Sequence, residues 1–388
     1  MTITIEEIVP KIEQLHQDLT PLYNKFIETL DNEKDIDQKH EEFLQYLNET
    51  TILHANHKMR QFLRIIANAS ISHFRTKHFF QKIERIIDSF QTQIKEKCSN
   101  EEIFNIFKIN KRILLFLFQA KIIILDSHMA HKMINSPEFL AYFYPELEAT
   151  MTKHQKEKAK LPESDNFEEK RQLAENDSLL CSFIRADAFD DFFSYVEKNK
   201  ISMKSKISPS FFDTNSFLAN KYPSLIQYAA FFGSYKIFTY LLHHNADLTS
   251  DLWFYSIHGR NDTIIHILEE NEIKPPKDSY KDCIIEAIRC HHNSIAYYLM
   301  EKYLHQKTTD TKYVFDKDMI KASLESFNFA IFAENFQFDS SRIDEILLTM
   351  SHTGYYSALE HLSKLPSIDL NTAYVSILVF SNGISTWF

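Results

Sequence analysis

Glycine is scarce in this chain of 388 residues, which contains only Gly233, Gly259, Gly354 and Gly383. Phosphate-binding loops of the GxGxxG or GxxxxGK[ST] type need glycines a few residues apart. A GxSxG nucleophile elbow needs two glycines around a serine. No pair of these four glycines has either spacing, so the sequence argues against the common nucleotide-binding enzymes and against the α/β-hydrolases.

Cysteine is equally rare, with Cys98, Cys181, Cys283 and Cys290 and no CxxC spacing among them. This usage argues against a disulfide scaffold and fits a reducing compartment. The first residues, MTITIEE, lack the basic start and apolar core of an export signal. We therefore expect a cytoplasmic protein.

Long apolar runs and excess positive charge are also missing. The most apolar window, from Ile113 to Leu125, is interrupted by Gln119 and Lys121 and falls short of the roughly 20 residues that span a bilayer. A net charge of -10 does not suit a surface that neutralises a phosphate backbone. We expect no membrane and no nucleic acid among the partners.

Apolar and aromatic side chains are plentiful, at 44% and 14% of the residues, so a chain of this length can fill the cores of two domains. Phe79, Ile83, Ile86 and Phe90 recur at three- and four-residue steps, which gathers one stripe on a helix. Residues 1–150 are predicted to form a helical bundle in which Ile113 to Leu125 is a buried helix. Residues 151–177 are rich in Lys, Glu and Asp, which predicts a charged, solvated linker.

A pattern repeats beyond the linker, in residues 178–388. Residues 224–248 read SLIQYAAFFGSYKIFTYLLHHNADL, which fits two short helices joined by a tight turn. With Ala229 as the reference, the equivalent positions are Ser256, Ala287, Ala322 and Met350, and spacings near about thirty residues are typical of stacked supersecondary units. Ahead of the first three references stand residues that can cap a helix N-terminus: Ser224, Asp251 and Asp282.

The first of these units resembles the ankyrin repeat. SLIQYAAFFG is similar to the consensus TPLHxAAxxG, and IFTYLLHHNAD is similar to the ending [IV]VxxLLxxGAD. Ser224 and Gln227 stand where that consensus has Thr and His. The resemblance implies an all-α fold in which a helical N-terminal bundle precedes an ankyrin-like solenoid of helix pairs, an arrangement similar to that of ankyrin proteins of protists.

The resemblance also implies a function, because stacked ankyrin units bind partner proteins along a groove made by the first helices and the connecting turns. We expect a non-catalytic interaction module without a cofactor. Of the adjacent pair Phe231 and Phe232, one side chain either anchors the partner or packs on the neighbouring unit. The contact positions that the resemblance implies are Lys221, Tyr222, Phe231, Phe232, His244, His258, Asn271, Asp278, Arg289, Cys290 and Lys302.

The histidines suggest metal binding as an alternative to the interaction module. The HxxH pairs His54 with His57 and His128 with His131 could share a metal ion, although no HExxH helix accompanies them. The run from Cys290 to His292 is interpreted as surface turn residues, because adjacent residues at a helix end point in different directions. We predict no metal site. The alternative is an enzymatic or metal-binding N-terminal domain for which the repeats recruit a substrate, and a scaffold that self-associates through those helices is a third possibility.

Overall fold

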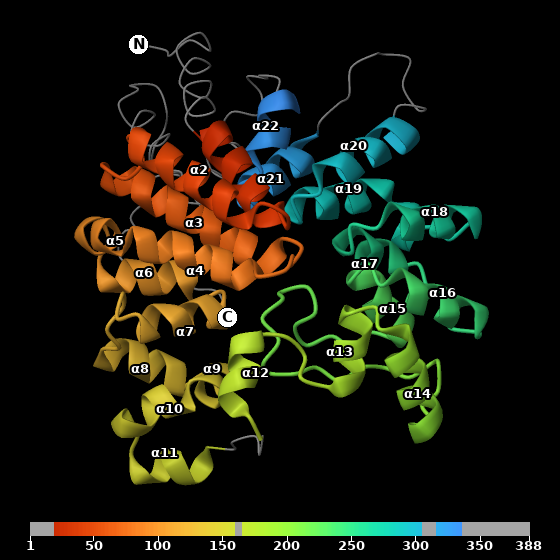
Figure 1. Ribbon diagram of the computed structural model, residues 1–388, viewed down its shortest axis with the longest axis horizontal. Coiled ribbons are helices and arrows are strands. Elements are labelled where there is room, and N and C mark those ends of the chain that lie inside the picture. The colour runs from red at the N-terminus through yellow and green to blue at the C-terminus, as the bar shows by residue number, and fades with distance from the viewer. Residues whose placement is uncertain (1–18, 160–164, 305–315, 336–388) are drawn as a thin grey trace. The chain divides into compact units, whose positions relative to one another are not determined.

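The fold is taken from a computed structural model that describes residues 19–159, 165–304 and 316–335 (Figure 1). Every regular element in these ranges is a helix, and the only β-pairing there is an isolated bridge between Lys206 and Ser224. The expected all-α class is confirmed. None of the described helices is both long enough and apolar enough to cross a membrane.

Contacts within the chain divide it into two compact units, which are described separately. The first unit comprises Met1–Asn68, Arg75–Cys98 and Ala296–Phe388, and the second comprises Ala69–Phe74 and Ser99–Ile295. The domain limits predicted at residues 150 and 178 stay a prediction.

The first unit is built on the apolar stripe expected from the sequence. Phe79, Ile83 and Ile86 are buried on α4, and Phe90 is buried directly after it. Helix α4 contacts α2, whose buried face contains Phe43, Leu47 and the polar side chain of His40. The helices of this unit are residues 19–31, α2 (Ile36–Glu49), α4 (Phe79–Ser89), α5 (Gln91–Lys97), η3 (Met300–Leu304), α21 (Lys317–Glu325) and α22 (Phe329–Asn335), while α3 (Asn56–Ser72) and α20 (Asn293–Leu299) run from one unit into the other.

The buried imidazole of His40 makes the stability of this unit depend on pH. Burial lowers the pKa of His40 from 6.5, and the charge of Arg85 lowers it further. The unfolded chain therefore takes up this proton at a higher pH than the folded chain, so stability is lost as the pH falls from about 6.5 through the folded-state pKa. We expect His40→Leu to remove this part of the decline, measured by urea unfolding across about pH 5 to 8.

The exposed His243 offers the control. His243→Leu should keep the pH dependence of the unchanged protein. Parallel stability curves for His40→Leu and the unchanged protein would contradict the prediction.

In the second unit, the expected buried helix is present but shorter than predicted. Ile113, Leu114 and Leu117 are buried on α7 (Lys111–Gln119), which the side chain of Asn110 caps by accepting the N–H groups of Arg112 and Ile113. The helix does not continue to Leu125, because Lys121 adopts a positive φ of 55°. The chain turns there, and the N–H of Ile122 returns to the carbonyl of Leu117.

The segment predicted as a linker contains two helices, α11 (Lys153–Lys158) and α12 (Phe167–Leu173). Arg171 of α12 is buried, and its guanidinium donates to the carboxylate of Glu146 at 2.8 and 3.0 Å and to the carbonyl of Tyr142 at 3.1 Å. The Tyr142 hydroxyl in turn donates to the carbonyl of Arg171 at 2.8 Å. Residues 167–173 therefore pack on the preceding helices, whereas their charge predicted a solvated connector. Tyr142 and Glu146 belong to α9 (Pro137–Tyr142) and α10 (Tyr144–Leu147). The other helices of this part of the unit are α6 (Asn100–Phe107), α8 (Ser127–Ile134) and η1 (Glu148–Thr150).

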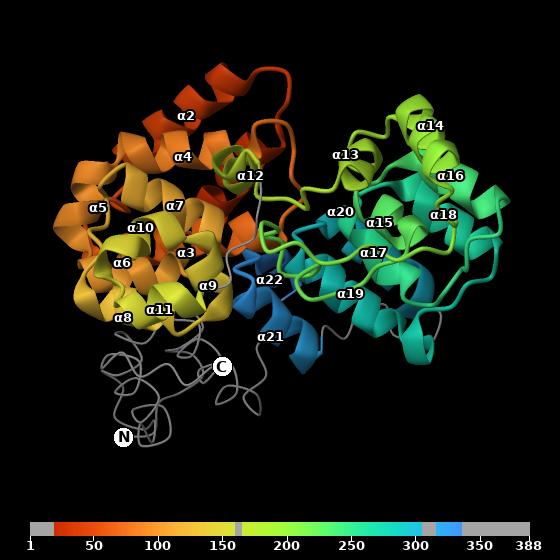
Figure 2. The same ribbon diagram turned by 90° about the horizontal axis from the view of Figure 1, so that it is seen from below.

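The rest of the second unit consists of helix pairs in two layers (Figures 1 and 2). The first helices of the first three pairs each contact their own partner helix and the first helix that follows, and the second helices of these pairs contact one another in sequence. The first helices are α13 (Leu179–Arg185), α15 (Leu225–Phe231), α17 (Leu252–His258) and α19 (Tyr280–Arg289). The second helices are α14 (Phe189–Asn199), α16 (Tyr235–His243) and α18 (Asp262–Glu270), and η2 (Pro276–Asp278) precedes α19.

The turns between paired helices share one backbone conformation. One residue in each turn has a positive φ: Asp187 (46°), Gly233 (64°), Arg260 (48°) and His291 (63°), with Phe327 (59°) between α21 and α22. In four of the turns the next N–H donates to the carbonyl five residues back, from Ala188 to Phe183, Ser234 to Ala229, His292 to Ala287 and Asn328 to Ser323. This bond confirms Ala229 and Ala287 as equivalent positions. It corrects the fourth reference from Ala322 to Ser323, because Phe327 and not Ser326 takes the left-handed conformation.

Only one of the three expected side-chain caps is present. Ser224 forms a capping box with Gln227 on α15. Asp251 makes no capping hydrogen bond on α17, because its backbone is already helical at φ -64° and ψ -19°. Asp282 lies inside α19, which begins earlier than expected, and Ser279 caps that helix by accepting the N–H of Asp282.

The turns of α15 and α17 touch through two glycines. A Cβ added to Gly259 would lie 2.0 Å from the carbonyl oxygen of Ala230 and 2.9 Å from the nitrogen of Gly233. A Cβ added to Gly233 would lie 2.5 Å from the carbonyl oxygen of Gly259. Both contacts are with backbone, so a side chain at either position forces the two helix ends apart.

We therefore expect Gly259→Ala to destabilise the stack by about 1 to 3 kcal/mol, the range found for overpacked cores. The measurement is the midpoint of thermal or urea unfolding. Lys236→Ala, on the exposed face of α16, should change the midpoint little. A Gly259→Ala variant as stable as this control would show that the turns do not approach so closely.

Candidate functional site

Most of the predicted contact residues do lie at the surface. Tyr222 is 62% exposed. The others that are exposed are Lys221, His244, Asn271, Asp278 and Arg289, whereas Phe232 and Lys302 are half-buried. Lys302 belongs to the first unit, where its ammonium donates to the Tyr298 hydroxyl at 2.8 Å. All the other predicted contact residues named here belong to the second unit.

Three predicted contact residues are buried instead: Phe231 and His258 are each 5% exposed and Cys290 is 0% exposed. The ring of Phe231 stacks on that of Phe217, with centroids 5.7 Å apart, and lies 4.9 Å from the ring of His258. The structure therefore shows Phe231 packed against the next helix pair, where His258 lies.

The interpretation of Cys290, His291 and His292 as surface turn residues is wrong. All three are buried, because the side chain of His73 covers this turn within the same unit. The His73 ring lies 5.9 Å from that of His291 and 6.1 Å from that of His292. His292 also bonds through Nδ1 to the carbonyl of Ile257 in the preceding helix pair, at 2.6 Å.

The most concentrated group of titratable side chains joins α17 to α19. His258 is the last residue of α17, and its Nε2 lies 2.8 Å from Oε1 of Glu286 on α19. The Sγ of Cys290, at the end of α19, lies 3.3 Å from Nδ1 and 3.4 Å from Nε2 of the same ring. These nitrogen, oxygen and sulfur atoms all lie within 4.8 Å of one another.

Aromatic rings enclose this group on the side of α15 and the loop before it. The Phe217 ring is 4.2 Å from the His258 ring and packs edge-on against Tyr255 at 5.0 Å. The Lys221 ammonium lies 3.3 Å from the centroid of Phe217, a cation–π contact. The ring of His258 is therefore shielded from solvent by aromatic side chains, whereas the Glu286 side chain keeps 18% exposure.

Burial is the largest influence on the pKa values of Glu286 and Cys290, the two ionisable neighbours of His258. Burial favours the neutral form of Glu286, yet the hydrogen bond from His258 and the charges of His258, Arg289 and Lys221 together hold its pKa below 4.5. Burial raises the pKa of the Cys290 thiol well above 9.0. At neutral pH the group therefore contains a carboxylate and a protonated thiol.

The order Cys290, His258, Glu286 resembles that of a nucleophile, a base and an orienting acid. Two observations argue against that chemistry. The sulfur has no exposure to solvent, so a substrate has no access to it, and a protonated thiol is not a nucleophile.

Two members of this neighbourhood, Glu286 and Phe217, were not foreseen from the sequence. Glu286 and Cys290 are four residues apart on one helix, which places them on one face, so periodicity could have paired them. No spacing connects them to His258, which lies in another repeat. Within the part of the chain that the structure describes, the HxxH pairs do not join any group of three metal-binding side chains.

Comparison with known proteins gives no assignment, because no protein-family model, curated protein or solved structure matches the chain. A functional proposal therefore depends on the geometry alone.

Phe231 and Phe232 form a matched pair for a stability test. Removing a buried phenylalanine costs about 3 to 5 kcal/mol, so we expect Phe231→Ala to destabilise the protein by about 3 kcal/mol. Phe232→Ala should cost less than half of this, because that ring is half-buried. Urea unfolding of both variants is the measurement, and equal losses would contradict the packing of Phe231.

Proposed function

We propose that this protein is a non-catalytic adaptor that holds a partner protein on the first-helix face of an ankyrin-like stack. The observation that carries the proposal is the shared geometry of its turns, with one left-handed residue at the same place in each helix pair. Repeated units of this kind expose a continuous surface made of equivalent positions. The resemblance of residues 224–248 to the ankyrin consensus is consistent with this arrangement.

The exposed contact positions have the chemistry of a recognition surface. Tyr and Arg are enriched at interfaces and at their energetic centres, and here Tyr222 and Arg289 are both exposed. Lys221 and Arg289 each lower the pKa of Glu286, so both cations lie near that carboxylate. Glu286 is already hydrogen-bonded to His258. The surface therefore suits a partner segment that brings an apolar side chain together with a carboxylate.

The four cysteines fit the same proposal. All of them are buried cysteines with reduced thiols, a state that a reducing compartment such as the cytoplasm maintains. The rival proposal gives an enzymatic or metal-binding role to the N-terminal helices and uses the stack to recruit a substrate. It lacks an observation of comparable strength among the described residues.

The test compares two double variants of the full chain. Partners are captured by crosslinking and mass spectrometry, and the affinity of the captured protein is then measured for each variant. Tyr222→Ala with Arg289→Ala should weaken binding by about 30-fold or more, since the loss of one anchor residue at an interface costs about 2 kcal/mol and about 1.4 kcal/mol is tenfold in affinity.

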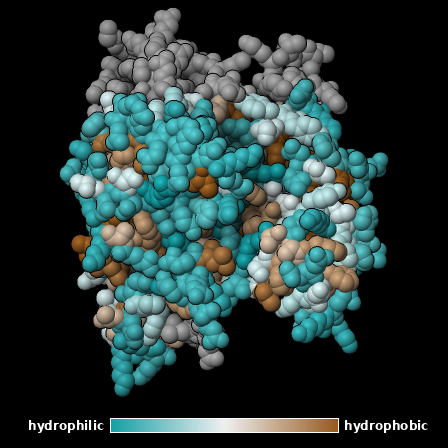
Figure 3. Space-filling view, viewed as in Figure 1, coloured by the Kyte–Doolittle hydropathy of each residue, from teal (hydrophilic) through white to brown (hydrophobic). Residues whose placement is uncertain are grey.

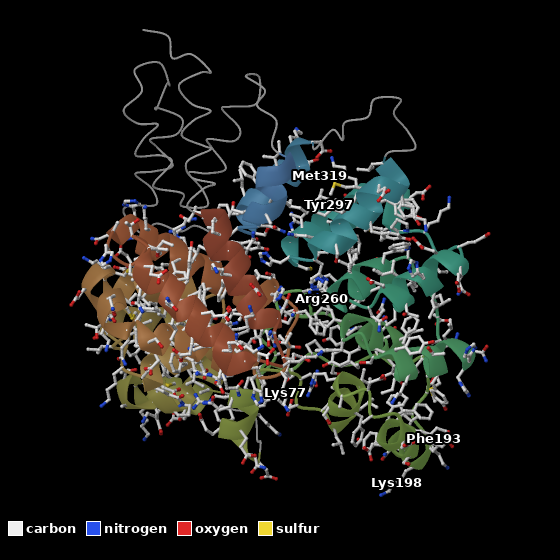
Figure 4. All side chains as sticks on the ribbon, turned by 45° about the horizontal axis from the view of Figure 1, so that its top comes forward. Lys77, Phe193, Lys198, Arg260, Tyr297 and Met319 are labelled. Carbon is white, nitrogen blue, oxygen red and sulfur yellow. The ribbon has the colours of Figure 1, made fainter. Side chains whose placement is uncertain are left out.

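The control lies in the layer of second helices, where Phe193 and Tyr235 are 41% and 42% exposed. Figure 4 shows Phe193 at α14, and Figure 3 shows apolar side chains over the α13 to α16 part of a mostly hydrophilic face. Phe193→Ala with Tyr235→Ala should leave binding unchanged. If this control alone weakens binding, the partner binds the second-helix layer and the proposed surface is wrong.

A further inference from the structure

The group formed by His258, Glu286 and Cys290 combines the three donor types that bind zinc in proteins: an imidazole nitrogen, a carboxylate oxygen and a thiolate sulfur. Two of the side chains are almost fully buried, and that of Glu286 is 18% exposed. The donors come from two neighbouring helix pairs, so an ion held by all three would join α17 to α19.

The spacing of the donor atoms is close to what a tetrahedral ion requires. Zinc bonds of about 2.0 to 2.3 Å at tetrahedral angles place a sulfur about 3.6 Å from a nitrogen, and that nitrogen about 3.4 Å from an oxygen. Here the sulfur lies 3.3 and 3.4 Å from the two nitrogens of His258, and the carboxylate oxygen lies 2.8 Å from Nε2. Binding of the ion requires the carboxylate to withdraw by about 0.6 Å. The sulfur is almost equally far from the two ring nitrogens and therefore faces the ring, so the ring must also turn until one nitrogen points at the ion.

We propose that His258, Glu286 and Cys290 bind one zinc ion that stabilises the contact between α17 and α19. The charges balance locally, because one carboxylate and one thiolate neutralise a divalent cation. The thiol proton of Cys290 passes to solvent when the Zn–S bond forms. A water molecule can fill the fourth position, as it does where only three protein side chains ligate zinc.

The surroundings support a largely buried site with three protein ligands. Arg289 lies 3.9 Å from the Oε2 atom of Glu286, on the oxygen that does not face His258, and such outer partners orient ligating carboxylates. Phe217 and Phe231 cover the His258 ring. This proposal does not rest on the partner-binding function, since none of the three ligands is among the exposed contact positions, although Arg289 lies beside Glu286.

The experiment uses the full chain under reducing conditions, stripped of metal with a chelator and then titrated with Zn²⁺ or Co²⁺. We expect one ion per chain by elemental analysis, together with the sulfur-to-cobalt charge-transfer band of a thiolate ligand. Zinc should also raise the thermal unfolding midpoint, because a ligand that binds only the folded state stabilises it.

Cys283 is a matched control, since it is also a buried cysteine of α19 but lies outside the group. Cys283→Ala should retain the ion, the cobalt band and the thermal shift, whereas Cys290→Ala should lose all three. Glu286→Gln preserves the size of the side chain and should weaken zinc binding by at least tenfold. Circular dichroism without metal checks that each variant keeps its helices.

Three results would overturn the proposal. The first is the absence of stoichiometric metal in the unchanged protein, which would leave the group as a hydrogen-bonded network. The second is full retention of metal by Cys290→Ala, and the third is bound cobalt without a sulfur band. The second and third results would assign the bound metal to other residues.

Discussion

The close contact between successive interhelical turns is the constraint on which the rest of this structure depends. At Gly259 and Gly233, backbone meets backbone with no space for a Cβ. Polar side chains also connect one turn to the previous helix pair, from the Ser234 hydroxyl to the carbonyl of Ile184 and from His292 to the carbonyl of Ile257. Because these bonds recur at equivalent positions, each helix pair is placed by the one before it.

The close approach of successive turns explains why the ends of the first helices contain both apolar and polar buried side chains. Residues at the ends of first helices are drawn toward the neighbouring pair, so Phe231, His258 and Cys290 are buried although the sequence predicted them as contact positions. Once the imidazole of His258 is buried, it requires polar partners. Glu286 and Cys290 of the next pair supply them. The buried polar group is thus a direct consequence of how closely the pairs approach.

Helix class and the main repeat register could be predicted from the sequence, because both follow from local periodicity. The stripe from Phe79 to Phe90 and the equivalence of Ala229 and Ala287 depend on residues only a few positions apart. The register at Ala322 was displaced by one, since the left-handed residue there is Phe327, and bulky side chains rarely adopt that conformation. No glycine marks the turn.

Burial across repeats could not be predicted, because it depends on contacts between residues distant in sequence. The covering of His291 and His292 by His73, and the pairing of His258 with Glu286, join segments that no local pattern connects. Charge was equally misleading at Arg171, whose guanidinium is neutralised by Glu146 and Glu168 and therefore tolerates burial. The charge of a residue is visible in the sequence, but its burial depends on partners that the sequence does not identify.

The central claim is that successive helix pairs stack in chain order through these turns. An experimental structure of the full chain, by crystallography or electron cryomicroscopy, tests it most directly. The account predicts α17 between α15 and α19, Gly259 against the carbonyl of Ala230, and the Ser234 hydroxyl bonded to Ile184. Helices that pair in another order, or a Gly259 turn separated from α15 by side chains, would contradict it.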